Sequence, residues 1–192
     1  MKKSKIKLAK CPCCSAERHR TEIQTCISFL EKIERQEFRH YKKLQLNQYT
    51  YDSFIDSRFE WACDSCLESK KAILASPGLQ ETPWTPHLAY FDTQLNCYSC
   101  KNEFLFKKEE KRAWYESYKL PVNAQPDNCL DCRRKIQNQN SENKTISKIL
   151  KKSEIEITDT ELEKVVGIYI SWNKIEKETY YQSILKRKRK NK

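Results

Sequence analysis

A helical repeat of apolar positions lies in the first quarter of the chain. Apolar side chains recur every three or four positions from Ile23 to Leu44, and charged side chains fill most positions between them. This spacing predicts a helix with one apolar stripe and one solvated face. Thr21 and Gln24 have the spacing of a capping box, so we expect the helix to begin there and to run to about Leu46.

A second helical repeat lies near the C-terminus. Thr158 and Glu161 form another capping-box pattern, and apolar residues then recur from Leu162 to Ile175. We expect one helix that runs past Tyr181 into the basic end of the chain. Its apolar stripe suits packing against the rest of the protein better than holding a partner, and both interpretations stay open.

Shorter patterns fill the middle of the chain. Residues 59–62 alternate like a short strand, and residues 67–76 predict a short helix that ends at the Pro-Gly pair after it. Residues 95–106 predict a β-hairpin with a C-x-x-C turn at its tip. Residues 108–118 are charged and aromatic and have the spacing of one or two helical turns.

Two polar or proline-rich stretches indicate where domains meet. Three prolines and one of the two glycines of the chain fall within residues 77–87, and residues 137–144 are rich in Asn and Gln. The second stretch predicts a linker or a fraying helix end. We therefore expect three parts, at residues 1–87, 88–140 and 141–192.

Four C-x-x-C pairs carry the strongest chemical signal in the sequence. Two of them are separated by 28 residues and the other two by 48 residues. Zinc prefers four thiolates in a tetrahedron, and a C-x-x-C turn offers two sulfurs to one ion. Pairing in sequence order gives two zinc ions, bound by Cys11, Cys14, Cys63 and Cys66 and by Cys97, Cys100, Cys129 and Cys132. Interleaved pairing remains the alternative, because spacing alone does not fix connectivity.

Other cysteines and histidines have weaker claims as ligands. Cys26 lies on the apolar stripe of the first helix, where a packed thiol is expected, and Cys13 is the odd member of the first cluster. His19 is the one credible substitute ligand, while His40 and His87 read as surface or packing residues. A zinc ion with four thiolates has no open position for water, so we expect structural sites and no enzymatic activity.

The net charge of +11 comes from the two ends of the chain. Residues 1–10 hold five lysines and residues 186–192 hold six bases, and neither segment has an acid. Such tails suit sequence-independent contact with RNA or DNA, or they act only as solubilising ends. Aromatic rings and basic side chains also gather around the second cysteine quartet. They form either a stacking surface for single-stranded nucleic acid or a packed aromatic core.

Residues 88–136 resemble a bacterial probable zinc-ribbon or treble-clef zinc-binding domain family. The resemblance rests on an aromatic-Asp approach, C-Y-S-C, F-L-F, Glu-Glu followed by Trp-Tyr, and C-L-D-C-R. Cys97, Cys100, Cys129 and Cys132 match the metal ligands of that family position by position, and Lys101 stands where such turns often carry glycine. The resemblance implies zinc binding and no particular activity.

Together these patterns predict a small α+β fold: two treble-clef-like zinc modules with short β-hairpins, a long inserted helix and a C-terminal helix. The three expected parts are an N-terminal zinc module with the inserted helix at 1–87, a treble-clef zinc-ribbon domain at 88–140, and a linker, helix and basic tail at 141–192. The leading hypothesis is a non-enzymatic zinc protein that contacts nucleic acid or a ribonucleoprotein through its basic termini. The alternatives are a protein-interaction adaptor that uses the C-terminal helix and a thiol redox sensor at the first cysteine cluster. Without a membrane span or a signal-type apolar core, we expect a cytoplasmic protein with reduced thiols.

Overall fold

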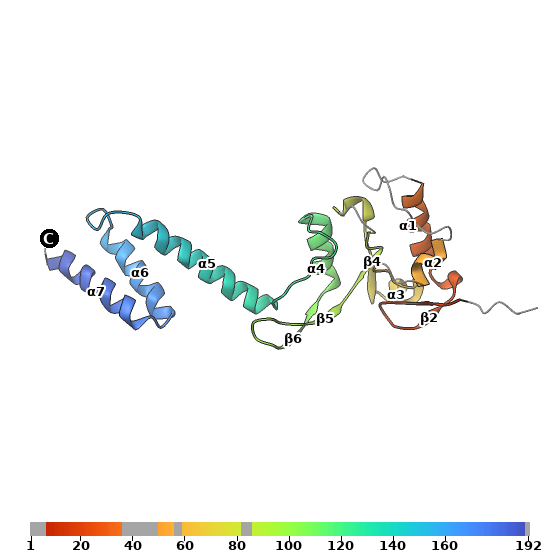
Figure 1. Cartoon of the computed structure of the whole chain (residues 1–192), viewed down its shortest axis with the longest axis horizontal. Helices are drawn as coiled ribbons and strands as arrows, with labels where there is room; N and C mark the ends of the chain where they lie inside the picture. The colour runs from red at the N-terminus through yellow and green to blue at the C-terminus, as the bar shows by residue number, and fades with distance from the viewer. Residues whose placement is uncertain (1–6, 36–49, 56–58, 82–85, 191–192) are drawn as a thin grey trace, which may run out of the picture. The chain divides into compact units, whose positions relative to one another are not determined.

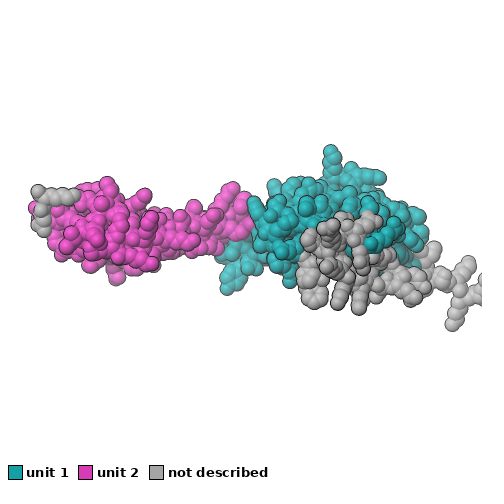
Figure 2. Space-filling model, turned by 90° about the horizontal axis from the view of Figure 1, so that it is seen from above, with its two compact units in different colours: residues 1–129 teal, residues 130–192 magenta. Residues whose placement is uncertain are grey.

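The computed structural model describes residues 7–35, 50–55, 59–81 and 86–190. The chain divides into two compact units, Met1–Cys129 and Leu130–Lys192 (Figure 2), and each is described by itself. None of the helices in the described ranges combines the length and the apolar character that crossing a bilayer requires. The division into three domains at residues 87 and 140 stays a prediction.

The first unit consists of short helices and three two-stranded antiparallel ladders (Figure 1). The ladders pair β1 with β2, β3 with β4, and β5 with β6. The elements follow in the order β1 (Ala9–Lys10), β2 (Glu17–Arg18), η1 (Arg20–Glu22), α1 (Gln24–Glu34), α2 (Thr50–Ile55), α3 (Asp64–Glu68), β3 (Ala72–Leu74), η2 (Pro77–Leu79), β4 (Ala89–Phe91), β5 (Thr93–Asn96), β6 (Glu103–Phe106), α4 (Lys108–Arg112) and η3 (Ala113–Ser117).

The apolar stripe of α1 forms the centre of the first core. Ile23, Leu30 and Ile33 are buried, and Phe54 and Trp61 pack in the same cluster with ring centroids 5.2 Å apart. The helical repeat read from the sequence is confirmed as far as Glu34. The predicted extension to Leu46 lies outside the described residues.

The predicted capping box at Thr21 is wrong. The box is formed by His19 and Glu22 and caps η1. The N-terminus of α1 has no capping side chain of its own; instead Asp64 accepts hydrogen bonds from the amides of Gln24 (2.9 Å) and Thr25 (3.2 Å). This carboxylate satisfies two amides that a helix start leaves without a partner. The cap comes from α3, which lies 40 residues further along the chain.

The predicted strand at 59–62 and helix at 67–76 are also wrong. Residues 59–62 form no ladder, while α3 begins already at Asp64 and ends at Glu68. Lys70 has a φ of 57°, a left-handed conformation that ends a right-handed helix. The apolar residues of β3 then pair with β4 rather than extending the helix.

A small aromatic core underlies the hairpin of β5 and β6. Tyr90, Phe106 and Tyr115 are buried together, and Trp114 packs against Phe106 with ring centroids 5.1 Å apart. The predicted hairpin is confirmed by β5 and β6, and the predicted helical turns by α4 and η3. The aromatic-core interpretation is therefore confirmed for these rings, whereas Tyr98 and Tyr118 are exposed.

The second unit consists of three helices, α5 (Leu130–Leu150), α6 (Asp159–Ser171) and α7 (Ile175–Lys190). The capping box of Thr158 and Glu161 is confirmed at the start of α6. The predicted linker at 137–144 is wrong, because α5 continues through it. The single C-terminal helix is likewise corrected to two helices. Asn173, with a φ of 53°, separates them.

The core of this unit uses one face of each helix. Ile149 of α5, Leu162 and Val165 of α6, and Ile184 of α7 are buried in one cluster. The predicted apolar stripe of the C-terminal region therefore packs inside its own unit. The combination of helices with short antiparallel hairpins and two four-cysteine groups confirms the small α+β fold class.

Candidate metal centres

The first four-sulfur group takes two of its sulfurs from the turn between β1 and β2. Within the turn, the Ser15 amide donates to the Cys11 carbonyl (2.7 Å) and the Cys11 amide donates to the Ala16 carbonyl (2.9 Å). Ser15 has a φ of 59°, a left-handed conformation that folds the backbone back sharply. The turn therefore holds the sulfurs of Cys11 and Cys14 close to one point.

The start of α3 supplies the other two sulfurs of this group. Cys63 is the N-cap residue of α3, and Cys66 lies within the helix. The Cys63 amide donates to the Cys11 sulfur at 3.3 Å, so the helix start is bonded directly to the turn. All four sulfurs lie within 4.8 Å of one another.

The second group is built on the turn between β5 and β6. The Lys101 amide donates to the Cys97 carbonyl (2.9 Å), and the Cys97 amide donates to the Asn102 carbonyl (2.9 Å). Lys101 has a φ of 62°. This conformation explains why turns of this type often carry glycine at the position. Cys97 and Cys100 provide the two sulfurs of the turn.

The remaining sulfurs of the second group come from Cys129 and Cys132, the latter in the first turn of α5. The Cys129 amide donates to the Cys97 sulfur at 3.3 Å. Asn128 holds the segment before Cys129 against the turn, because its side-chain oxygen accepts hydrogen bonds from the amide (3.0 Å) and the hydroxyl (2.6 Å) of Ser99. These four sulfurs also lie within 4.8 Å of one another.

The two groups repeat one design. Each has a turn that closes on a left-handed residue and a second pair of cysteines at a helix start. In each, one sulfur of the turn is 3.9 Å from one sulfur of the second pair, Cys14 from Cys63 and Cys100 from Cys129. A zinc tetrahedron with bonds of about 2.3 Å requires sulfurs about 3.8 Å apart, whereas a disulfide requires about 2.0 Å. The spacing therefore fits two zinc ions, and the pairing follows sequence order.

The surroundings of the sulfurs shift their pKa values in both directions. Burial raises the pKa of Cys14, but hydrogen bonds from the Ala16 backbone and from the side chains of Cys66, Arg18 and Cys11 outweigh it and lower that pKa to about 6. Burial is the main reason why the pKa of Cys11 rises to about 11 and why that of Cys66 is also raised.

In the second group, burial likewise raises the pKa of Cys97. Backbone hydrogen bonds from Cys100, Cys129 and Ser99 and a side-chain bond from Cys100 outweigh it and bring the pKa to about 6. Zinc binds thiolates and must displace the protons held by the other cysteines. Metal affinity at both sites therefore falls as the pH falls.

The remaining candidate residues lie outside both groups. Cys26 is fully buried and its thiol donates to the Ala62 carbonyl at 3.3 Å, which confirms the predicted packed thiol. Cys13 lies in the first turn but is not one of the four sulfurs. His19 accepts a hydrogen bond from the Thr21 amide instead of joining the sulfurs, and His40 lies outside the described residues. The described residues, which include all ten cysteines, contain no disulfide.

Four sulfurs around one point leave no coordination position for water or substrate. Such a site stabilises the fold and holds the turn against the helix. The sequence alone does not reveal the hydrogen bonds that support the sites, such as those that Asp64 accepts from α1, because these partners are brought together only by the tertiary fold.

A comparison with known protein families matches residues 91–141 to the model of a family described as a probable treble clef domain. The match includes all four cysteines of the second group and confirms the resemblance read from the sequence. No curated protein and no solved structure shows a significant match to the chain. Segment 91–141 is therefore a treble clef zinc-binding domain, and the chain is a zinc-binding protein.

Proposed function

We propose that the protein is a non-enzymatic zinc protein that binds the phosphate backbone of nucleic acids. One observation carries the proposal: a polar face of α5 with three lysines at helical spacing. This α5 polar face lines a shallow groove of about 570 Å³ and consists of Asn140, Asn143, Lys144, Ser147, Lys148 and Lys151.

The charges of the α5 polar face are available to a ligand. Among the residues that the structure describes, no acidic side chain forms an ion pair with Lys144, Lys148 or Lys151. Their spacing places three positive charges along about two turns of helix. Asn140, next to the lysines, adds an amide that can donate to phosphate oxygens.

The basic side chains at the C-terminus are weaker candidates for a nucleic-acid contact than the sequence indicated. Arg187 forms an ion pair with Glu154, and Arg189 forms one with Glu163. Lys188 donates to the Glu154 carbonyl at 2.7 Å. These charges form contacts within the three-helix unit, and residues 1–6 of the other basic end lie outside the described residues. The proposed contact therefore moves from the tails to the α5 polar face.

The alternative functions have less support. An adaptor would need the apolar stripe of α6, yet Leu162, Val165 and Tyr169 are buried inside their own unit. A redox sensor would need an activated thiol outside the zinc sites. Burial raises the pKa of Cys13, which makes this thiol a poorer nucleophile. A cytoplasmic location, where thiols stay reduced, is part of the proposal.

The test compares binding of zinc-loaded full-length protein to labelled 12-nucleotide RNA and DNA by fluorescence anisotropy between 50 and 200 mM salt. In the variant Lys144→Gln/Lys148→Gln/Lys151→Gln, we expect weaker binding and a salt dependence whose logarithmic slope falls by about 2 to 3. The control Lys164→Gln/Lys174→Gln/Lys186→Gln removes equal charge from exposed positions on the other helices and the turn between them. Equal slopes for both variants would contradict the proposal.

A further inference from the structure

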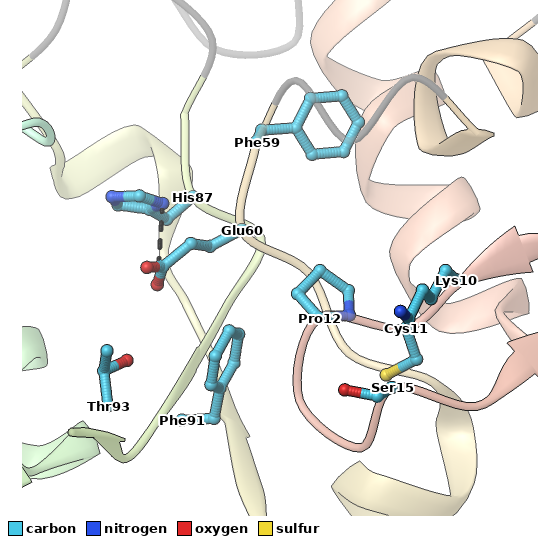
Figure 3. Close-up of a pocket in the computed structure, with 9 residues that line it drawn as sticks. All are labelled: Lys10, Cys11, Pro12, Ser15, Phe59, Glu60, His87, Phe91 and Thr93. Atoms are coloured by element: carbon cyan, nitrogen blue, oxygen red, sulfur yellow. Dashed lines mark ion pairs between the residues drawn. The ribbon is translucent and has the colours of Figure 1, made fainter.

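A cavity of about 540 Å³ opens in the first unit beside the first zinc site. Figure 3 shows the residues that line it, with the Glu60 carboxylate turned toward the His87 ring. Pro12, Phe59 and Phe91 give the cavity apolar walls, and the exposed Lys10 also lines it. Neither the zinc sites nor the α5 polar face uses this cavity.

Glu60 is held in a fixed orientation at the cavity wall. The ammonium of Lys111 lies 3.1 Å from both of its carboxylate oxygens and 2.7 Å from the Thr93 hydroxyl. Equal distances place the ammonium in front of the carboxylate fork. The outward lone pairs remain for one further donor, and the Glu60 side chain is 31% exposed.

His87 adds a second acceptor beside this carboxylate. Its Nε2 lies 2.7 Å from the Val122 carbonyl, which only accepts, so Nε2 carries the proton. Burial lowers the pKa of His87 despite the opposing effect of Glu60, and the ring is therefore neutral at pH 7. Nδ1 is then a lone-pair acceptor, buried, without a hydrogen-bond partner among the described residues, and 3.8 Å from a Glu60 oxygen. This corner of the cavity lacks a donor.

The charges around the cavity decide which donor fits. Lys111 already neutralises Glu60, and Lys10 adds one positive charge, so a cationic ligand is repelled. A neutral N–H donor on a flat ring satisfies Glu60 and packs on the apolar walls. An anionic group on the same ligand reaches Lys10.

We propose that this cavity binds an unpaired nucleobase through its exocyclic amino group, with the attached phosphate at Lys10. The proposal rests on the proposed nucleic-acid binding and names the bases it prefers. Adenine, cytosine and guanine each carry an exocyclic amino donor for Glu60. Uracil has no amino group, and its single ring N–H donor lies between two carbonyl oxygens that face the carboxylate with like polarity. Single-stranded recognition commonly combines such edge contacts with stacking on aromatic side chains.

The experiment measures binding of zinc-loaded full-length protein to oligo(A), oligo(C) and oligo(U) 12-mers, and to AMP and UMP. One hydrogen bond to a charged acceptor gives an expected preference of about tenfold for oligo(A) over oligo(U), and the same order for AMP over UMP. The variant Glu60→Met/Lys111→Met removes both charges with little change in volume and abolishes the preference. Lys10→Gln weakens binding to oligo(A) more than the exposed control Lys107→Gln.

The α5 triple variant separates this proposal from the proposed function, because it lowers all affinities but keeps the preference. Preference for AMP without any oligonucleotide binding would support the cavity as a site for free nucleotides and refute the backbone contact. Equal binding of oligo(A) and oligo(U) together with equal binding of AMP and UMP would overturn the cavity proposal. The comparisons of oligo(A) with oligo(U) and of AMP with UMP use the unaltered protein and do not depend on the folding of a variant.

Discussion

The buried ion pair of Glu60 and Lys111 gives the sharpest stability prediction. The Lys111 side chain is 3% exposed and that of Glu60 is 31% exposed, so the partners differ in their access to water. Lys111 also lies 4.8 Å from the centre of the Phe91 ring and 5.7 Å from that of Phe106. These rings and one hydroxyl do not replace a carboxylate.

Glu60→Met leaves the Lys111 ammonium buried without a counter-charge. We expect a loss of about 3 kcal/mol in the free energy of unfolding, at the lower end for breaking a buried pair. Lys111→Met leaves a carboxylate that water can still reach and costs about 1 kcal/mol. The double variant replaces the pair with apolar side chains of similar size and costs less than about 1 kcal/mol.

The assay is urea unfolding of all four proteins with zinc bound, with the zinc content measured before each titration. The sum of the losses in the two single variants exceeds the loss in the double variant by about 3 kcal/mol, which is a strong coupling for residues in contact. If the single effects simply add in the double variant, or if Glu60→Met costs as little as Lys111→Met, the description of this pair as buried and mutually dependent is wrong.

Three further predictions concern other parts of the first unit. Asp64→Ala removes the cap of α1 and lowers stability by about 1 to 2 kcal/mol, whereas Asp64→Asn keeps an acceptor and costs less; equal unfolding midpoints would refute the cap. Cys26→Ala retains full zinc content and costs about 1 kcal/mol, and a lost metal ion would show that this thiol is a ligand after all. The lowered pKa of His87 means that the unfolded chain binds this proton first as the pH falls. Stability is therefore lost below about pH 6.5, more in the wild type than in His87→Gln, and a difference that stays constant from pH 7.5 to 5.5 would contradict this.

The sequence could predict the features that depend on local spacing. A C-x-x-C turn needs only four residues to bring two sulfurs together, so both turns were visible. The apolar stripes of α1 and α6 were visible for the same reason, since a helical repeat is a local pattern. The Thr158 capping box depends on residues three apart and was likewise correct.

The features that depend on tertiary contacts could not be predicted in this way. Thr21 has the spacing of a cap, but Asp64, which lies 40 positions after Gln24, caps the helix instead. The apolar residues of β3 suited a helix locally and became a strand because β4 offers a pairing edge. Residues 137–144 read as a linker because they are polar, yet they contain neither glycine nor proline, and α5 continues through them. The cavity at Glu60 joins segments that lie far apart in the sequence.

Zinc content measured by native mass spectrometry tests the central claim most directly. We predict two zinc ions per chain in the wild type and one in Cys63→Ser/Cys66→Ser, because each four-sulfur group binds its own ion. Cys97→Ser/Cys100→Ser is expected to retain one ion as well, at the first site. A wild-type chain with fewer than two zinc ions, or a variant that keeps both, would contradict the account of two separate four-cysteine zinc sites.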